Sequence, residues 1–264
     1  MLAGRSQFPL LLARAARAKG IRVLAVAHAG ETEPAIAEWV DELIWVKLGQ
    51  LQKTIDFFRE RGVTEAVMAG GILKTTAYQN IEPDARALHI LGRLTDFHDD
   101  GFLRAFADAF EQEGIAIRPS TLYTPELLAP EGILTRRRPT DTEREDIQFG
   151  WRIAKAVGRL DIGQCVVVRH RMVLAVEAIE GSDETIRRGG ALGRGDAVVI
   201  KVSKPHQDLR FDLPSVGCQT IAVMNEVQAK ILVIEAGKTL LFDRQAFIDA
   251  ADQAGITVWA RGDD

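Results

Sequence analysis

The stretch PLLLARAARAKGIRVLAVAH, residues 9–28, predicts the fold of the first half of the chain. Residues 9–20 have the apolar spacing of an amphipathic helix, with proline near the start and glycine at the end, where these residues favour helix termini. Residues 21–28 form a short, almost continuous apolar run, which is typical of a strand buried on both faces of a parallel sheet. A helix that leads directly into such a strand is part of a β-α-β unit.

The same alternation continues on both sides of this stretch. Residues 1–9, MLAGRSQFP, look like the end of a first strand that runs into a glycine turn, so that the strand is unusually short or the start lies further upstream. Strands are also expected in ELIWVK, residues 42–47, and TEAVMAGG, residues 64–71, with the helix LQKTIDFFRERG, residues 51–62, between them. This rhythm predicts a Rossmann-like, doubly wound parallel sheet.

The second half of the chain has a different pattern. CVVVRHRMVLAVEA, residues 165–178, predicts an antiparallel hairpin, and the later strands and helices favour a second α/β domain with a mixed sheet. Between the halves, APEGILTRRRPTDTE combines proline, glycine and three successive arginines, which is typical of a boundary. We therefore expect an N-terminal Rossmann-like domain at residues 1–128, a linker at 129–139 and a C-terminal α/β domain at 140–264.

Composition narrows the class of protein. The 264 residues are 47% hydrophobic and 27% charged, which is ordinary for a soluble globular protein. A net charge of −4 gives no overall field that would attract nucleic acid. No apolar run is long enough for a membrane span, and we see no signal peptide. Two distant cysteines, Cys165 and Cys218, match no metal-binding spacing, and a cytoplasmic location is expected.

Two glycine turns follow apolar strands of the first domain. Gly4 and Ser6 belong to the first turn, and Gly70 and Gly71 belong to the second. In an open parallel sheet the ligand crevice lies beyond the carboxyl ends of the strands, where glycine lets the backbone approach a phosphate. Neither turn completes the dinucleotide fingerprint or a P-loop. A nucleotide half-site and a tight structural turn therefore remain as alternatives.

Two stretches that precede helices could bind ions. Asp99 and Asp100 suit a helix N-cap, or equally a magnesium ion or a bound water. VEAIEGSDETIRR, residues 176–188, places hydroxyl and guanidinium groups near a helix start, which suits a phosphate, although a surface helix capped by Ser182 or Asp183 explains the same pattern. The candidate residues of this stretch are Glu180, Ser182, Asp183, Arg187 and Arg188.

The segment KVSKPHQDLRFDLPSVG, residues 201–217, gathers charges of both signs between two prolines. Lysine and arginine can neutralise phosphate oxygens, and aspartates can hold a divalent cation or orient water. The prolines restrict the backbone and so reduce the entropy lost when these charges are fixed around a ligand. We interpret the segment as a phosphate-and-metal site, with a plain surface segment as the alternative. Its candidate residues are Lys204, Gln207, Asp208, Arg210 and Asp212.

Seven motifs of this chain resemble, in the same order, one family of enzymes. It is the two-domain UDP-2,3-diacylglucosamine pyrophosphatase family of the lipid A pathway, which is unrelated to the calcineurin-like phosphoesterases. The likeness spans nearly the whole chain, and its last four motifs together are highly specific. The motifs are LAGRSQFP, VMAGGILK, HDDGFLRA, GRLDIGQ, VLAVEAIEGSD, KVSKPHQDLRFDLPSVG and EAGKTLLFD.

The resemblance implies magnesium-dependent hydrolysis of UDP-2,3-diacylglucosamine to UMP and 2,3-diacylglucosamine 1-phosphate. It also implies a homodimer of two α/β domains with a catalytic C-terminal domain, and transient contact with the inner membrane leaflet. The essential aspartate of the family motif DLPxxG is Asp212 here. We expect Asp212 to bind or orient a magnesium-bound water, with Asp208 and Glu180 as further metal ligands. The expected contacts of the substrate are Gly4, Ser6, Gly70, Gly71, Asp99, Asp100, Ser182, Asp183, Arg187, Arg188, Lys204, Gln207 and Arg210.

One departure from the family pattern concerns the first glycine turn, where Ser6 stands in place of an expected second glycine. A serine hydroxyl can still donate to a phosphate, so activity is expected to survive. Two alternative functions remain open from sequence: a dinucleotide-dependent oxidoreductase, which the missing glycines disfavour, and a non-catalytic nucleotide-sugar or lipid carrier.

Overall fold

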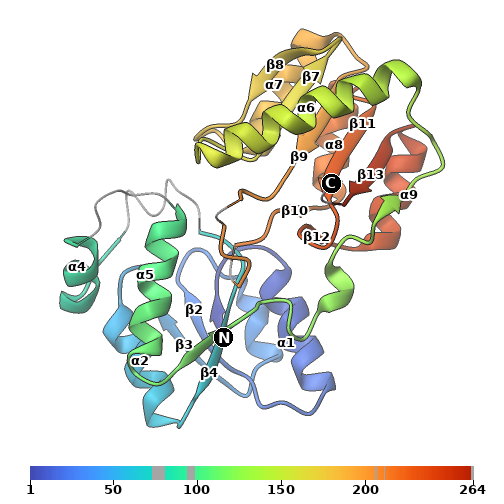
Figure 1. Ribbon diagram of the computed structural model, residues 1–264. Helices are drawn as coiled ribbons and strands as arrows, with labels where there is room; N and C mark the ends of the chain where they lie inside the picture. Colours follow the sequence, from blue (N-terminus) through green and yellow to red (C-terminus); the bar gives the residue numbers. More distant parts are fainter. Residues whose placement is uncertain (73–80, 94–98, 206, 211, 263–264) are drawn as a thin grey trace. The chain divides into compact units, whose positions relative to one another are not determined.

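Figure 1 shows the computed structural model of the chain. Contacts divide the chain into two compact units, of which the first comprises Met1–Pro125 and Asp208–Asp212, and the second comprises Glu126–Gln207 and Leu213–Asp264. The short segment Asp208–Asp212 is thus separated in sequence from the rest of the unit to which it belongs. The structure describes residues 1–72, 81–93, 99–205, 207–210 and 212–262, without the side chains of 99 and 100.

The N-terminal unit is a five-stranded parallel sheet in the order β3-β2-β1-β4-β5. Helices α2, α4 and α5 pack on one face of the sheet, and α1 covers the other (Figure 1). This arrangement confirms the predicted doubly wound parallel sheet. The strands are β1 (Leu2–Ala3), β2 (Leu24–His28), β3 (Glu42–Val46), β4 (Glu65–Ala69) and β5 (Ala116–Arg118), and the helices are α1 (Phe8–Ala18), η1 (Pro34–Glu38), α2 (Leu51–Glu60), α4 (Ala85–Leu91) and α5 (Asp99–Glu111).

The C-terminal unit is built on a six-stranded mixed sheet in the order β6-β13-β11-β9-β7-β8. Strands β9, β11 and β13 are parallel, whereas β7 and β8 form the predicted antiparallel hairpin and β6 is antiparallel to β13. The mixed sheet is therefore confirmed. The strands are β6 (Gly132–Ile133), β7 (Cys165–Arg169), β8 (Met172–Val176), β9 (Val198–Lys201), β11 (Ile231–Glu235) and β13 (Thr257–Arg261).

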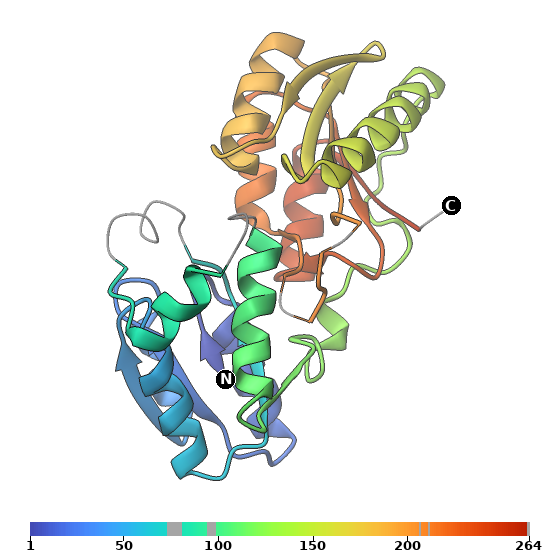
Figure 2. The same cartoon turned by 60° about the vertical axis from the view of Figure 1, so that its left-hand side comes forward.

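Helices cover both faces of the C-terminal sheet. Figure 2 shows the sheet between α6 on one side and α7 and α8 on the other, in agreement with two separate apolar clusters on its two faces. The start of α6 carries the predicted capping box between Thr140 and Glu143. A small parallel pair, β10 (Ser215–Val216) with β12 (Leu240–Leu241), lies outside the main sheet. The helices are α6 (Asp141–Arg159), α7 (Ser182–Gly193), α8 (Cys218–Glu226), α9 (Arg244–Gln253) and the short η2 (Pro125–Leu127).

The border between the units differs from the predicted domain borders. The first unit ends at Pro125 rather than at residue 128, and the predicted linker 129–139 belongs to the second unit. The reason is that β6, within this stretch, extends the C-terminal sheet by pairing with β13. In the part of the chain that the structure describes, no helix is both long and apolar enough to cross a membrane.

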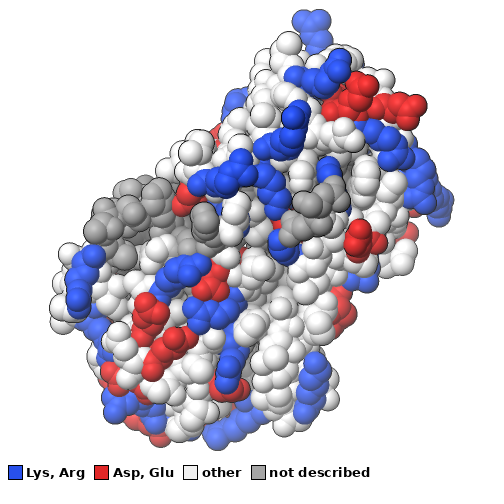
Figure 3. Space-filling model, viewed as in Figure 1, with Lys and Arg blue, Asp and Glu red and all other residues white. Residues whose placement is uncertain are grey.

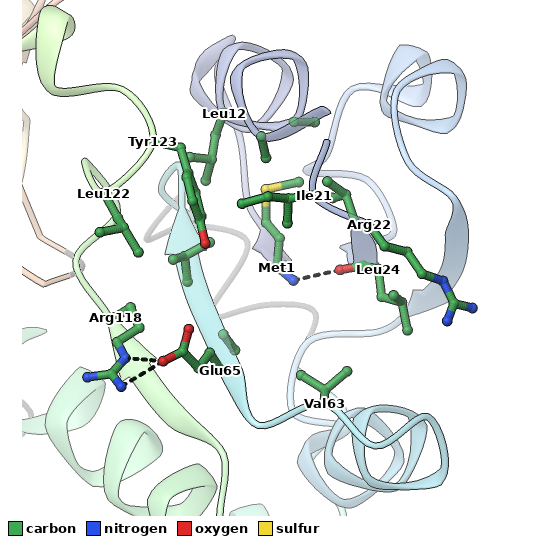
Figure 4. Close-up of a pocket in the computed structure, with 15 residues that line it drawn as sticks. Met1, Leu12, Ile21, Arg22, Leu24, Val63, Glu65, Arg118, Leu122 and Tyr123 are labelled. Carbon is green, nitrogen blue, oxygen red and sulfur yellow. Dashed lines mark hydrogen bonds and ion pairs between the residues drawn. The ribbon is translucent and has the colours of Figure 1, made fainter. Parts of the chain in front are cut away.

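A small apolar pocket of about 110 Å³ lies at the amino ends of β2 and β4 (Figure 4). Arg118 and Glu65 form an ion pair of 2.6 Å among its lining residues. The amino ends of the strands are at the opposite edge of the sheet from the glycine turns. Since ligands of open parallel sheets bind at the carboxyl edge, a functional site is expected there.

Candidate functional site

The two glycine turns of the N-terminal unit lie against each other at the carboxyl ends of β1 and β4. Gly4 N donates to Ala69 O at 2.8 Å, and Arg5 N donates to Gly71 O at 2.7 Å. A Cβ atom on Gly4 would lie 2.5 Å from the Gly71 oxygen, and one on Gly70 would lie 2.2 Å from the Arg5 oxygen. Gly70 also has a φ of +83°, which favours glycine. Gly4 and Gly70 are therefore required by the close approach of the two turns.

Gly71 differs from its neighbour. A Cβ atom added there would have no atom of the described residues within 4 Å, and its φ lies outside the left-handed region. Packing against the described residues therefore does not explain why this exposed position lacks a side chain. It lies beside the switch point of the sheet, between β1 and β4, where doubly wound folds bind their ligands. A ligand that approaches the backbone closely would explain the glycine.

Ser6 has a φ of +88°, in the left-handed region that glycine adopts without cost. This is the position at which the resembled family has a glycine, so the backbone conformation explains the preference. The Ser6 hydroxyl accepts a hydrogen bond from Phe8 N at 3.3 Å, at the start of α1. The serine thus keeps the turn and uses its hydroxyl at the helix start.

His28, at the carboxyl end of β2, contacts the first glycine turn and was not among the candidate residues from sequence. Its Nδ1 lies 3.0 Å from Ala3 O, which also accepts from Thr32 Oγ1 at 2.5 Å. Because a carbonyl oxygen only accepts, the contact places the proton of the neutral ring on Nδ1 and leaves Nε2 as an acceptor. Burial lowers the pKa of His28, and the hydrogen bond to Ala3 and the charge of Glu31 offset this only in part. A histidine at the end of a buried strand was the available sequence signal.

The segment Asp208–Asp212 is ordered by a carboxylate–guanidinium pair. Arg210 donates to both carboxylate oxygens of Asp208, with Nε and Nη2 at distances of 2.9–3.2 Å. Its backbone N also donates to Asp208 Oδ1 at 3.0 Å. Asp212 N donates to Asp208 O at 3.1 Å, which closes the turn that carries the Asp212 side chain. Asp208 therefore fixes the backbone around Asp212.

Helix α5 holds this segment in the N-terminal unit. Arg210 Nη1 donates to Glu111 Oε1 at 2.8 Å, and Arg104 Nη1 lies 3.9 Å from Asp208 Oδ2. Ser120 N, after β5, donates to Arg210 O at 2.8 Å. Sequence reasoning missed Arg104 and Glu111, which are polar positions seven residues apart, two turns along the same helix. Figure 3 shows basic and acidic side chains interspersed in this way over the visible face of the N-terminal unit.

These contacts change the pKa values of the pair. Partial burial acts to raise the pKa of Asp208, but the hydrogen bonds from Arg210 and the charges of Arg210 and Arg104 outweigh it, so the pKa is lowered. The hydrogen bond to Asp208 raises the pKa of Arg210 further, against a smaller effect of burial. Arg210, predicted to bind phosphate, is thus already paired with two carboxylates, Asp208 and Glu111.

The C-terminal unit fixes the residues that precede this segment. Gln207 is buried and its Oε1 accepts from Lys204 N at 2.9 Å and from Ser203 Oγ at 3.1 Å. Lys204 forms an ion pair with Asp161. Lys201 Nζ donates to Ser215 O at 2.9 Å and so ties the start of the loop to its end. Gln207 was predicted to contact substrate. In the structure its side-chain oxygen accepts hydrogen bonds from Ser203 and Lys204 and so stabilises the turn at residues 203–207.

The stretch after β8 does not gather its predicted residues at one point. Glu180 accepts from Arg188 at 2.5 Å, whereas Arg187 pairs with Glu226 at 3.0 Å and with Glu184 at 2.6 Å. The two neighbouring arginines therefore have different partners, and Arg187 pairs within the helix and with the end of α8.

The alternative interpretation of this stretch, a helix capped by the side chain of Ser182 or Asp183, is wrong. The N-cap residue is Gly181, with no side-chain hydrogen bond, and Ser182 and Asp183 are the first two residues of the helix. Ser182 Oγ instead donates to Glu177 Oε1 at 3.0 Å, because the buried Glu177 carboxylate needs donors.

The described residues test the predicted metal ligands. Among them, no group of three or more His, Cys, Asp or Glu side chains is arranged to hold a metal ion. Asp208 and Glu180 belong to different units, and each accepts from an arginine. The side chains of Asp99 and Asp100 lie outside the described residues. Mg²⁺ commonly takes one or two carboxylates together with substrate phosphates and water. A site in which Asp212 is the main protein ligand therefore fits Mg²⁺ better than a site of three carboxylates. The metal-ligand roles of Asp208 and Glu180 stay predictions.

Comparison with known proteins covers nearly the whole chain. Residues 1–127 match the family model of the LpxI N-terminal domain, and residues 130–259 match that of the LpxI C-terminal domain. UDP-2,3-diacylglucosamine pyrophosphatase LpxI of Caulobacter vibrioides is 33% identical over 269 residues, covering 98% of this chain and 95% of that protein. Among solved structures, the biotin carboxylase domain of Hydrogenobacter thermophilus 2-oxoglutarate carboxylase covers 75% of this chain and 42% of that chain, at 17% identity and a TM-score of 0.26, a likeness too weak to bear on fold or function.

Proposed function

This chain belongs to the LpxI family, and we propose that it hydrolyses the diphosphate bond of UDP-2,3-diacylglucosamine in lipid A synthesis. The observation that carries the proposal is the identity of 33%, over 98% of the chain, to a protein named for this activity. In the proposed reaction water attacks one phosphorus of the diphosphate, and the bond from that phosphorus to the bridging oxygen breaks. The products are UMP and 2,3-diacylglucosamine 1-phosphate.

In this proposal Asp212 is the catalytic residue and Asp208 is a positioning residue. The Asp212 carboxylate orients the attacking water, and the bonds from Arg210 to Asp208 hold the turn on which Asp212 lies. Mg²⁺, when bound, supplies charge neutralisation at the diphosphate and lowers the pKa of a bound water. Asp212 is the residue that would hold it. Gly71, at the switch point of the N-terminal sheet, would admit a phosphate or the uridine of the nucleotide to the backbone.

The direct test is to follow products from UDP-2,3-diacylglucosamine with the full chain, by ³¹P NMR and by chromatography of the lipid. We expect UMP and the lipid 1-phosphate in equal amounts, loss of turnover in excess EDTA, and recovery when Mg²⁺ is added. Full turnover in excess EDTA would remove the metal from the proposal. A protein that binds the substrate but releases no UMP would be a carrier, and the enzymatic proposal would then fail.

Two neighbouring loops of the C-terminal unit support contact with lipid. Leu160, Ile162 and Ile179 are 69%, 50% and 78% exposed, although large apolar side chains rarely gather at the surface. The loops are joined because Gln164 N donates to Glu177 Oε2 at 3.2 Å. The exposed Arg159 lies beside the first loop, which suits an anionic surface. We propose that these loops contact the inner membrane leaflet.

Replacing Ile179 with asparagine is expected to weaken sedimentation with vesicles of phosphatidylethanolamine and phosphatidylglycerol by about tenfold, since the burial of one large apolar side chain is lost. Leu192→Asn is the matched control, because Leu192 is 62% exposed at the other end of α7. Equal vesicle binding of wild type and Ile179→Asn would rule out this surface. The homodimer implied by the family likeness stays a prediction, which sedimentation velocity can test.

A further inference from the structure

Glu235 is a fully buried carboxylate that the proposed mechanism does not use. It ends β11 and begins the motif EAGKTLLFD. Its Oε1 accepts from Lys155 Nζ at 2.7 Å and from Lys238 Nζ at 2.8 Å. Its Oε2 accepts from Ser203 N at 2.9 Å, at the start of the loop that leads to Asp212. Glu235 Oε1 therefore accepts from two ammonium groups, and Oε2 accepts from the backbone at the start of the segment 201–217.

This arrangement places two positive charges close together. Because both nitrogens bond to the same oxygen, they lie no more than 5.5 Å apart, which is the sum of the two distances. Together, Lys155, Lys238 and Glu235 carry two positive charges and one negative charge. Lys155 and Lys238 are 19% and 34% exposed, so the charge reaches the surface although the carboxylate does not. Two ammonium groups at this separation can each donate to a different oxygen of one phosphate or diphosphate.

Further cations lie at the same edge of the sheet. Strands β9, β11 and β13 run side by side in one direction (Figure 1), and their last residues are Lys201, Glu235 and Arg261. Lys155 Nζ lies 5.3 Å and Arg261 Cζ lies 4.9 Å from the centre of the Trp151 ring. The carboxyl ends of parallel strands are where open α/β sheets bind ligands.

We infer that Lys155 and Lys238, held by Glu235, form a binding site for a diphosphate group on the C-terminal unit. The inference rests on the proposed function for the identity of the natural ligand, which would be the diphosphate of the nucleotide lipid. Within the C-terminal unit, the bond from Ser203 N to Glu235 ties this site to the start of the segment 201–217.

The test uses inorganic pyrophosphate as the probe and calorimetry with the full chain as the readout. Lys155→Met and Lys238→Met are each expected to weaken binding by about tenfold or more, as the loss of one charge-assisted hydrogen bond predicts. Each variant leaves Glu235 one lysine partner and Ser203, so the buried carboxylate stays compensated. Lys230→Met is the matched control, because Lys230 directly precedes the same strand at its opposite end.

A second measurement avoids substitution. In the wild-type protein, pyrophosphate should slow the acetylation of Lys155 and Lys238, measured by mass spectrometry, and leave Lys230 unchanged. The inference is overturned if the wild type does not bind pyrophosphate, or if it binds but neither lysine is protected and neither variant is weakened. Neither readout requires turnover, so a protein that binds pyrophosphate through these lysines but releases no UMP would contradict only the proposed function.

Discussion

Replacing Asp212 with asparagine is expected to reduce UMP release from UDP-2,3-diacylglucosamine by about 10³-fold or more, in the range found when a group that handles a proton is removed. The reason is that asparagine keeps the size of the side chain and loses the negative charge that would orient water or hold a cation. Asparagine also keeps the bond from Asp212 N to Asp208 O, so we expect the turn itself to be retained. Initial rates and thermal unfolding measure the two effects separately.

Two further aspartates make this result interpretable. Asp208→Asn should lose part of the activity, by about tenfold to a hundredfold, because the turn is less well positioned once Arg210 is no longer paired with a carboxylate there. Asp196→Asn is the control: Asp196 has a surface ion pair with Arg169 and a positive φ that asparagine tolerates, and its activity should equal that of the wild type. Undiminished UMP release by Asp212→Asn would remove Asp212 from the mechanism.

The fold was predictable where the pattern is local. Windows of about twenty residues are enough to recognise the apolar run of β2 after α1 and the hairpin of β7 and β8. In such a window, consecutive residues show either burial on both faces or an alternating pattern. The capping box of Thr140 and Glu143 is local in the same way. The order of the strands does not follow from such windows, and the predicted linker includes β6 because a two-residue strand at a sheet edge has little sequence pattern.

The candidate site was predictable only in part. The sequence motif predicts Asp212 as the catalytic residue, yet it does not show that Arg210 is bound to Glu111, which lies 99 residues away in the chain. The same limit applies to Glu235 and Ser203, which are 32 residues apart and meet because β9 and β11 are adjacent. Arg187 and Arg188 illustrate the converse case: residues that are neighbours in sequence point to different partners on a helix. Long-range pairing depends on the arrangement of the sheet, and short motifs do not contain it.

The paired substitutions Gly70→Ala and Gly71→Ala should differ strongly in their effect on stability. We expect Gly70→Ala to lower the free energy of unfolding by about 3 kcal/mol or more, because its Cβ would lie 2.2 Å from a backbone oxygen at a φ of +83°. Gly71→Ala should change this free energy by no more than about 0.5 kcal/mol, because its Cβ meets none of the described residues within 4 Å. Denaturant titration of the two variants measures both values.

Activity then separates the two explanations for the glycine turns. If the backbone at Gly71 is approached by the nucleotide, Gly71→Ala should raise KM for the substrate and weaken UMP binding although the protein is as stable as the wild type. Gly70→Ala should instead lose activity only in proportion to the folded fraction. A Gly71→Ala protein with unchanged KM and unchanged UMP binding would show that both turns serve the packing of β1 against β4 alone. The nucleotide would then have to bind elsewhere, because an added side chain at Gly71 would not disturb it.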